Sequence, residues 1–337
     1  MKFHSLIQRS FFSAIFLFSL LGCFSGQTSF SFGGQRPGGP EDGGGEIPNN
    51  PVEDPKFDEL PNGKKLSSIK VRGSSLTLSK GTGTTFGRSQ WQSYLRLKEQ
   101  SQTRGDGRLE WTIRDLDKGE ILAGSADIDD RIFGASVSKI YVGGALLDHQ
   151  EGDISSSQLQ LMADMLVVSS NSAWTNLQRQ IGNGDSNLGR QRIHRFTQGL
   201  GYEKTQGFQG WWGNLHGNEL TARELGEFLE DTYKRKYEGA DYLWKMLHTV
   251  RTGTSRARKY IPRTLFVGGK TGSYAGGTFD TDIPASVNVN VRNHAITFFH
   301  NGTQYAISIL NNTGSEENAA LIAGGLFQEY VLKNRAP

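Results

Sequence analysis

The stretch from Val137 to Leu147 most constrains how this chain folds, because it is apolar on nearly every side and yet contains a lysine. A helix that is apolar all round is typical of a domain core. Lys139 therefore brings an ammonium group into that core, where it needs a polar partner or a lowered pKa. Ser136 lies three residues earlier, one helical turn away on the same face. The sequence thus predicts a buried helix that starts with a serine beside a desolvated lysine.

This pair of side chains has a defined chemistry. A desolvated lysine can act as a base, and a serine next to a base can be a nucleophile. At the start of a helix, backbone N–H groups near Ser136 can also stabilise a developing oxyanion. The Ser-x-x-Lys spacing alone is weak, since Ser67 and Lys70 repeat it in a polar, strand-like segment. We interpret that second copy as chance, because this spacing in a strand does not bring the two side chains together.

Two further motifs follow in the chain. Ser169-Ser170-Asn171 comes after a second predicted helix, and Lys270-Thr271-Gly272 continues a strand that is expected to begin at 265–267. Either motif alone has an ordinary interpretation, as a helix-ending turn or as an exposed strand end. The signal becomes specific because all three motifs occur in this order, with the lysine of the first motif in an apolar helix.

The three motifs together resemble the active site of serine β-lactamases and penicillin-binding proteins. The resemblance covers about residues 89–334. The order of predicted elements agrees with it, since helix, strands, helices, strands and helix is an α+β order. The expected fold is therefore a mainly antiparallel sheet flanked by N- and C-terminal helices, with a helical subdomain between them.

Individual elements of this fold are also expected from the pattern of apolar residues. A helix is predicted from about Ser89, followed by a hairpin. Late in the chain, Asn301-Gly302 is a strong hairpin turn, and a closing helix is capped by Ser315. The expected strands are 109–113, 121–123, 287–291, 295–299 and 305–310. The closing helix is expected to bury four residues: Ala319, Ile322, Leu326 and Tyr330.

The resemblance implies catalytic roles for three residues. Ser136 would be acylated, and Lys139 would be its base or proton relay. Ser169 would pass a proton to the leaving nitrogen. The reaction that follows is the opening of an amide or cyclic amide through an acyl-serine intermediate.

The resemblance also implies five substrate-binding residues. Asn171 would hold the substrate amide and the lysine of the first motif, while Lys270 and Thr271 would bind the substrate carboxylate. Gly272 would let the substrate backbone approach the strand. The backbone N–H of Ser273, with that of the acylated serine, would form the oxyanion hole.

The chain departs from class A β-lactamases in the region after the second motif. Those enzymes carry a glutamate in a Glu-x-x-Leu-Asn pattern that activates the deacylating water, and no such pattern occurs in 201–221. Glu203 and Glu219 lie at the ends of this stretch, where strand and helix termini are expected. The middle residue of the second motif is Ser170 rather than Asp, as in the Ser-x-Asn of penicillin-binding proteins. These departures put fast deacylation in doubt.

The N-terminus has the features of an exported lipoprotein. A basic n-region and an apolar run end in Leu20-Leu21-Gly22-Cys23, which looks like a bacterial lipobox. Cys23 is the only cysteine, so it is either a stray thiol or the lipidated first residue of the mature protein, and its position favours lipidation. We expect anchoring in the cell envelope, at the outer membrane if the host has one.

Composition divides the chain into four parts and excludes some functions. The parts are a signal peptide (1–22), a lipidated Gly/Pro-rich tether (23–62), a small β segment (63–88) and the hydrolase domain (89–334). A net charge of +3 leaves no basic surplus for nucleic acid. The seven histidines show no zinc spacing. We expect a monomer without metal or cofactor.

Three functions stay open on these grounds. The first is a class A β-lactamase-like hydrolase, with antibiotic resistance as its consequence. The second is a penicillin-binding DD-peptidase that acts on peptidoglycan stem peptides, which suits the envelope address and the Ser-x-Asn motif. The third is a non-catalytic lipoprotein that binds cell-wall peptide. The β-lactamase-like hydrolase ranks first on the order of elements.

Overall fold

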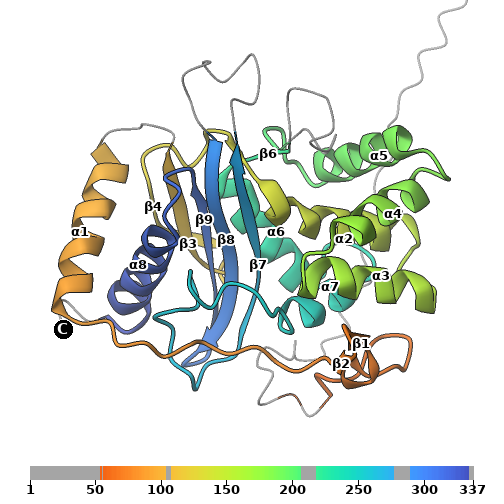
Figure 1. Ribbon diagram of the computed structural model, residues 1–337, viewed down its shortest axis with the longest axis horizontal. Helices are drawn as coiled ribbons and strands as arrows, with labels where there is room; N and C mark the ends of the chain where they lie inside the picture. The colour runs from red at the N-terminus through yellow and green to blue at the C-terminus, as the bar shows by residue number, and fades with distance from the viewer. Residues whose placement is uncertain (1–53, 55, 104–107, 206–217, 277–288, 334–337) are drawn as a thin grey trace, which may run out of the picture. The chain divides into compact units, whose positions relative to one another are not determined.

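The computed structural model describes residues 54, 56–103, 108–205, 218–276 and 289–333. Within them, an antiparallel five-stranded sheet lies beside a group of helices (Figure 1). The α+β fold expected from the sequence is therefore confirmed. The predicted signal peptide and Cys23 lie outside the described residues. Among the helices that are described, none combines the length and apolar character needed to cross a membrane.

The sheet has the strand order β4-β3-β9-β8-β7. Its strands are β3 (Leu109–Asp115), β4 (Glu120–Gly124), β7 (Val267–Gly276), β8 (Val289–His300) and β9 (Thr303–Asn311). Both predicted hairpins are confirmed, since β3 pairs with β4 and β8 with β9. The second hairpin turns at Asn301-Gly302, where both residues have positive φ, 49° and 80°, as a tight hairpin turn requires.

Strand β8 is longer than the sequence predicts, because Asn293 continues it where the apolar alternation breaks. The described parts of the two expected strands, 287–291 and 295–299, form one strand. Asn293 is fully buried, and its Nδ2 donates to the backbone oxygens of Phe133 (2.8 Å) and Gly134 (3.0 Å). Its Oδ1 accepts a backbone N–H of β9 at 2.8 Å. Burial of an amide side chain costs little free energy when its hydrogen bonds are made, so the strand can continue through Asn293.

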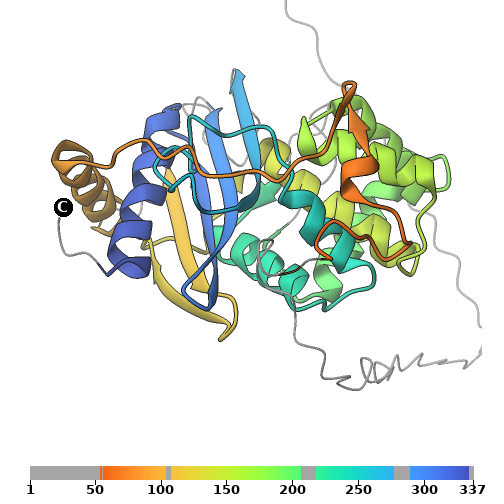
Figure 2. The same ribbon diagram turned by 90° about the horizontal axis from the view of Figure 1, so that it is seen from below.

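The terminal helices α1 (Arg88–Thr103) and α8 (Glu316–Leu326) cover one face of the sheet (Figures 1 and 2). Ser315 caps α8 as predicted, with its Oγ accepting from Asn318 N at 3.1 Å. After α8 the chain widens into a π turn, η3 (Phe327–Val331), and this corrects one expectation. The π turn buries Phe327 and Val331, and Tyr330, expected in the core, is half-buried.

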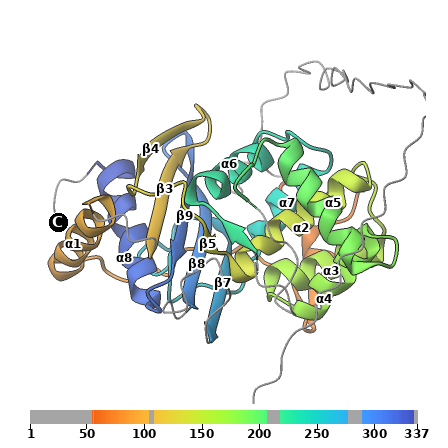
Figure 3. The same ribbon diagram turned by 90° about the horizontal axis from the view of Figure 1, so that it is seen from above.

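The remaining helices form the helical part of the fold, in which α2 lies among the others (Figure 3). They are η2 (Ala135–Ser138), α2 (Lys139–His149), α3 (Ser156–Val167), α4 (Asn171–Ile181), α5 (Ser186–Gly199), α6 (Ala222–Tyr233) and α7 (Ala240–Leu247). Every residue from Lys139 to Leu147 is buried, which confirms the predicted core helix. Helix α6 joins this part to the sheet, where Thr112 Oγ1 of β3 donates to Ala222 O at 3.2 Å.

A short N-terminal segment packs on the helical part. It contains η1 (Leu66–Ser68), β1 (Lys70–Val71) and β2 (Ser74–Ser75), so the expected small hairpin is present. Its apolar side chains join the core of the helical part. Phe57 and Leu60, which the sequence assigned to the tether, are each only 3% exposed in that core. The packed part of the chain therefore begins before residue 62, and 63–88 is not a separate unit.

The second copy of the Ser-x-x-Lys spacing lies in this segment. Ser67 belongs to η1 rather than to a strand, while Lys70 begins β1. Both residues are exposed, and the Ser67 hydroxyl donates to Asp58 at 2.7 Å. The copy has no lysine partner for its serine, in agreement with its interpretation as chance.

Glu110 of β3 is a buried carboxyl group whose protonation should make the stability of the fold depend on pH. The residue is 2% exposed, and neither carboxylate oxygen has a hydrogen-bond partner among the described residues. Burial, with smaller effects from Asp130, Asp127 and Asp129, raises the pKa of Glu110 from 4.5 to about 10. The folded state therefore keeps a proton that the unfolded state loses above pH 4.5.

We predict that Glu110→Gln removes a pH-dependent loss of stability. Between these two pKa values the free energy of unfolding of the parent protein falls by about 1.4 kcal/mol per pH unit through this group. The free energy of unfolding of the variant, relative to that of the parent protein, should therefore increase from pH 6 to pH 9. Urea unfolding at several pH values measures it. A difference that stays constant with pH would contradict the assignment.

Candidate active site

Ser136 lies on the 3₁₀ turn η2, and the backbone around it is held against strand β7. The preceding residue, Ala135, has φ of 49°, which is strained for a residue with a Cβ. A Cβ on Gly272 of β7 would meet Gly134 O at 2.5 Å and Val137 N at 2.9 Å. The structure therefore gives the glycine of the Lys-Thr-Gly motif a packing role, because it lets the turn that carries Ser136 approach the strand.

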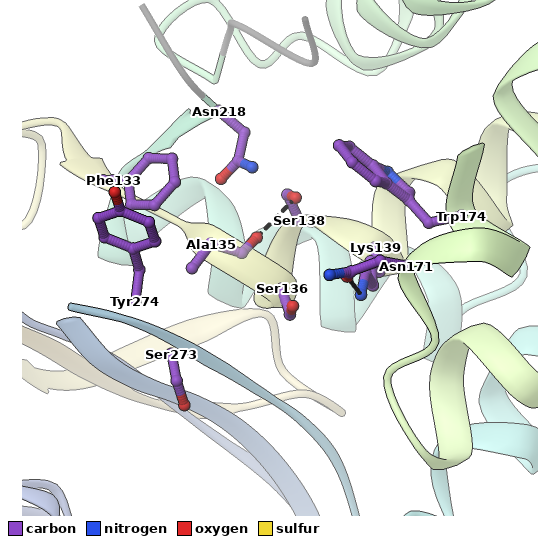
Figure 4. A pocket seen from close by; sticks show the side chains of 10 residues that line it. All are labelled: Phe133, Ala135, Ser136, Ser138, Lys139, Asn171, Trp174, Asn218, Ser273 and Tyr274. Atoms are coloured by element: carbon purple, nitrogen blue, oxygen red, sulfur yellow. Dashed lines mark hydrogen bonds between the residues drawn. The ribbon is translucent and has the colours of Figure 1, made fainter. Parts of the chain in front are cut away.

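Lys139 follows on the first turn of α2 and is turned towards the second motif (Figure 4). Its Nζ donates to Asn171 Oδ1 at 2.6 Å, to Ser169 O at 2.7 Å and to Ser169 Oγ at 3.3 Å. The residue is 2% exposed, and burial lowers the pKa of Lys139 to about 7. Near neutral pH its amine is therefore available as a base.

Lys270 reaches the same serine from strand β7. Its Nζ donates to Ser169 Oγ at 2.9 Å and to Thr271 O at 2.8 Å. Burial, and then the charges of Lys139 and Arg256, hold the pKa of Lys270 well below its usual range. The structure thus brings all three motifs together at one hydroxyl. Ser169 itself has φ of 62°, a second strained backbone position in the site.

Two adjoining cavities open at Ser136 and Ser273. The first has aromatic walls and contains the amide side chain of the second motif (Figure 4). Its lining residues are Phe133, Ala135, Ser136, Ser138, Lys139, Asn171, Trp174, Asn218, Ser273 and Tyr274. Ser136 is half-buried, and within the described part of the chain its hydroxyl makes no hydrogen bond. It is open to a molecule that enters either cavity.

The second cavity, of about 270 Å³, is polar. Its lining residues are Ser136, Ser169, Thr252, Gly253, Ser255, Arg256, Thr271, Ser273 and Glu316. Thr271 therefore faces a cavity as expected, and its hydroxyl lies 2.8 Å from that of Thr252. Lys270 is fully buried and lines neither cavity. A substrate carboxylate would meet hydroxyl groups here before it met Lys270.

No sequence pattern predicts the segment from Thr252 to Arg256, which forms one wall of the second cavity. Its position depends on long-range contacts with the N-terminal segment, which runs beside it (Figure 2). The Arg258 guanidinium donates to the backbone oxygens of Lys80 (2.6 Å), Thr252 (3.0 Å) and Val250 (3.2 Å). Backbone carbonyls carry no sequence signal, so no residue pattern could have predicted these contacts.

The region that holds the glutamate of class A enzymes is described only at its ends. Residues 206–217 lie outside the described part, so most of the stretch 201–221 cannot be compared. At its C-terminal end Glu219 is in β6 (Glu219–Leu220), which pairs with β5 (Ile132–Phe133), and its carboxylate lies 3.3 Å from Arg131. The described residues contain no group of three or more metal-ligating side chains suited to an ion.

Comparisons with solved structures define the class of the fold. A class A beta-lactamase from Bacteroides cellulosilyticus shares 18% identity and a TM-score of 0.56, over 73% of this chain and 98% of that one. A beta-lactamase from Chitinophaga pinensis shares 16% identity and a TM-score of 0.56, over 73% of this chain and 100% of that one. TLA-1 extended-spectrum beta-lactamase shares 16% identity and a TM-score of 0.56, over 72% of this chain and 98% of that one. At these identities the likeness shows the fold alone, which is that of class A β-lactamases.

The sequence comparison then gives the family. The chain belongs to the beta-lactamase enzyme family, whose model matches residues 120–325, more than half of the chain. This membership supports a β-lactamase-like hydrolase. A search of curated protein sequences finds no significant match.

We predict that Gly272→Ala destabilises the protein through the turn that carries Ser136. The new methyl group would meet Gly134 O just before η2 at 2.5 Å and Val137 N within η2 at 2.9 Å, and backbone cannot rotate away. The expected loss is about 1–3 kcal/mol in the free energy of unfolding, measured in urea. Gly199→Ala is the matched control, because nothing lies within 4 Å of its added Cβ. Equal stabilities of the two variants would contradict the close packing of η2 on β7.

Proposed function

We propose that the protein is a serine hydrolase that opens β-lactams or related amides through an acyl-Ser136 intermediate. The observation that carries this proposal is the environment of Lys139. Its amine is removed from water, is held by Asn171 and Ser169, and has a pKa of about 7. Ser136 lies one turn away on the same chain segment and lines both cavities. Its hydroxyl makes no hydrogen bond among the described residues. A base and a nucleophile in this relation suit acyl transfer.

The first step follows from this arrangement. The neutral amine of Lys139 takes the proton of Ser136 as its oxygen attacks the substrate carbonyl. The oxyanion that forms accepts hydrogen bonds from the backbone N–H groups of Ser136 and Ser273. As the C–N bond breaks, Ser169 Oγ gives its proton to the leaving nitrogen. Either lysine amine that contacts Ser169 can return a proton to it.

The second step requires a water molecule that attacks the acyl-serine. Among the described residues that line the two cavities, Glu316 is the only carboxylate. It is bound by Arg256 at 2.6 Å and by Ser255 at 2.5 Å, so it is not free to act as a base. The second candidate function is a penicillin-binding DD-peptidase that acts on peptidoglycan stem peptides, and the Ser-x-Asn form of the second motif, with Ser170 in the middle position, favours it.

We predict a covalent adduct at Ser136 when the protein is mixed with a penicillin. Intact-protein mass followed over time should give an increase equal to the mass of the drug, and Ser136→Ala should give none. An adduct that disappears while drug is consumed would identify a β-lactamase, and a persistent adduct would indicate a penicillin-binding peptidase or a slow hydrolase. If the parent protein neither forms an adduct nor consumes drug, or if Ser136→Ala forms the same adduct, the proposed nucleophile is wrong.

We also propose that the protein is carried to the cell envelope and anchored by a lipid on Cys23. The support is the lipobox-like sequence at residues 20–23. Cys23→Ser should remove the acceptor thiol, so the variant should not incorporate a labelled fatty acid and should leave the membrane fraction. A membrane-bound Cys23→Ser protein after cleavage of the first 22 residues would contradict this proposal.

A further inference from the structure

The polar cavity beside Ser136 contains an arginine whose hydrogen-bonding capacity is already used. A guanidinium has five N–H donors. In Arg256, Nε donates to Glu316 at 3.0 Å. One terminal nitrogen donates to Gly272 O (3.1 Å) and to Asn293 O (3.3 Å). The other terminal nitrogen donates to Ser273 Oγ (2.5 Å) and to Glu316 (2.6 Å). The Arg256 side chain is 8% exposed. It therefore offers no free donor to a substrate carboxylate.

Glu316 presents the opposite charge to the cavity. Its side chain is 40% exposed, against 8% for Arg256, so the negative member of the pair is the one that faces solvent. Its carboxylate accepts from Arg256 and Ser255, and these partners and the Arg256 charge lower the pKa of Glu316. It remains ionised at neutral pH. The other polar side chains of the cavity carry hydroxyls, and the buried Lys270 meets the cavity only through Ser169, to which its Nζ donates at 2.9 Å.

The position of the cavity identifies which part of a substrate would meet Glu316. The cavity includes Ser169, the residue proposed to protonate the leaving nitrogen, and Thr271. The other cavity contains Asn171, which is expected from the resemblance to hold the substrate amide. A substrate that acylates Ser136 would therefore place its leaving-group side near the carboxylate.

We propose that Glu316 is a specificity-determining residue that selects substrates with a positively charged group on the leaving-group side of the reacting amide, that is, zwitterionic rather than purely anionic ones. This inference rests on the proposed function. The hydroxyls of Thr252, Thr271 and Ser273 can hold the substrate carboxylate, while Glu316 attracts the cation. Removal of the Glu316 charge would leave Arg256 uncompensated, which reverses the preference towards anionic substrates.

Two cephalosporins test this directly. Cephaloridine and cephalothin share the 7-thienylacetamido group and the ring carboxylate, and differ in a cationic pyridinium or a neutral acetoxy group on the leaving-group side. The second-order rate of Ser136 acylation is measured for each by intact mass, and the ratio of the two rates is compared between variants. Intrinsic differences in drug reactivity cancel in that comparison.

Glu316→Gln should lower the ratio of cephaloridine to cephalothin by about three- to fivefold, as expected for a partly exposed charge pair. Glu317→Gln is the matched control. Glu317 also lies in the first turn of α8 and pairs with the same chain segment, through Lys259 and Tyr260, but it does not line the cavity. Its ratio should equal that of the parent protein. Glu316→Asp, which keeps the charge, should retain most of the preference.

The outcomes are separable. An unchanged ratio in Glu316→Gln, with Ser136 still acylated, would overturn the inference and leave the proposed function standing. An equal change in both Gln variants would overturn it as well, because it would reflect only the attachment of α8. If Glu316→Gln fails to fold, Glu316→Asp decides the matter: because it keeps the charge, a three- to fivefold loss of the cephaloridine preference in this variant, with the ratio of Glu317→Gln unchanged, overturns the inference. If the parent protein neither forms an adduct with either drug nor consumes it, the proposed function is overturned and this inference with it.

Discussion

Two lysine side chains that have been taken out of water meet at one serine hydroxyl, and the rest of the site depends on this arrangement. Lys139 reaches Ser169 from the core helix, and Lys270 reaches it from the edge strand of the sheet. Two ammonium groups so close and so deeply buried repel each other, which favours the loss of a proton from at least one of them. Asn171 and the Ser169 carbonyl accept from Lys139 and hold its amine at the second motif.

The fold supplies the rigidity that this arrangement needs. The helical part and the sheet are joined at the turn that carries Ser136, where Gly272 permits close packing and Asn293 binds the backbone before the turn. These contacts, which adjoin Ala135, keep its strained backbone in place. At the second cavity, the N-terminal segment and Arg258 hold in place the wall that contains Arg256. Segments distant in sequence thus fix the distances between the reacting groups.

Much of the fold could be predicted from local pattern, and less of the site. The core helix, both hairpins and the cap at Ser315 follow from periodicity and turn residues, and the structure confirms them. The three motifs were predicted to converge, and they do. Asn293 was missed because a buried amide in a strand looks like a break in alternation. The pairing of Arg256 with Glu316 was missed because it joins a loop to a distant helix, and contacts of that kind leave no local signal.

The most direct test of the account is the titration of Lys139 in the folded protein. Lysine labelled with ¹³C at Cε reports protonation of the amine by NMR, and the resonance of Lys139 is identified by its absence in Lys139→Arg. The account predicts a midpoint near pH 7, because burial lowers this pKa to about 7. A midpoint close to the ordinary lysine value of 10.5 would contradict it. The amine would then be an ammonium at neutral pH, unable to take the proton of Ser136.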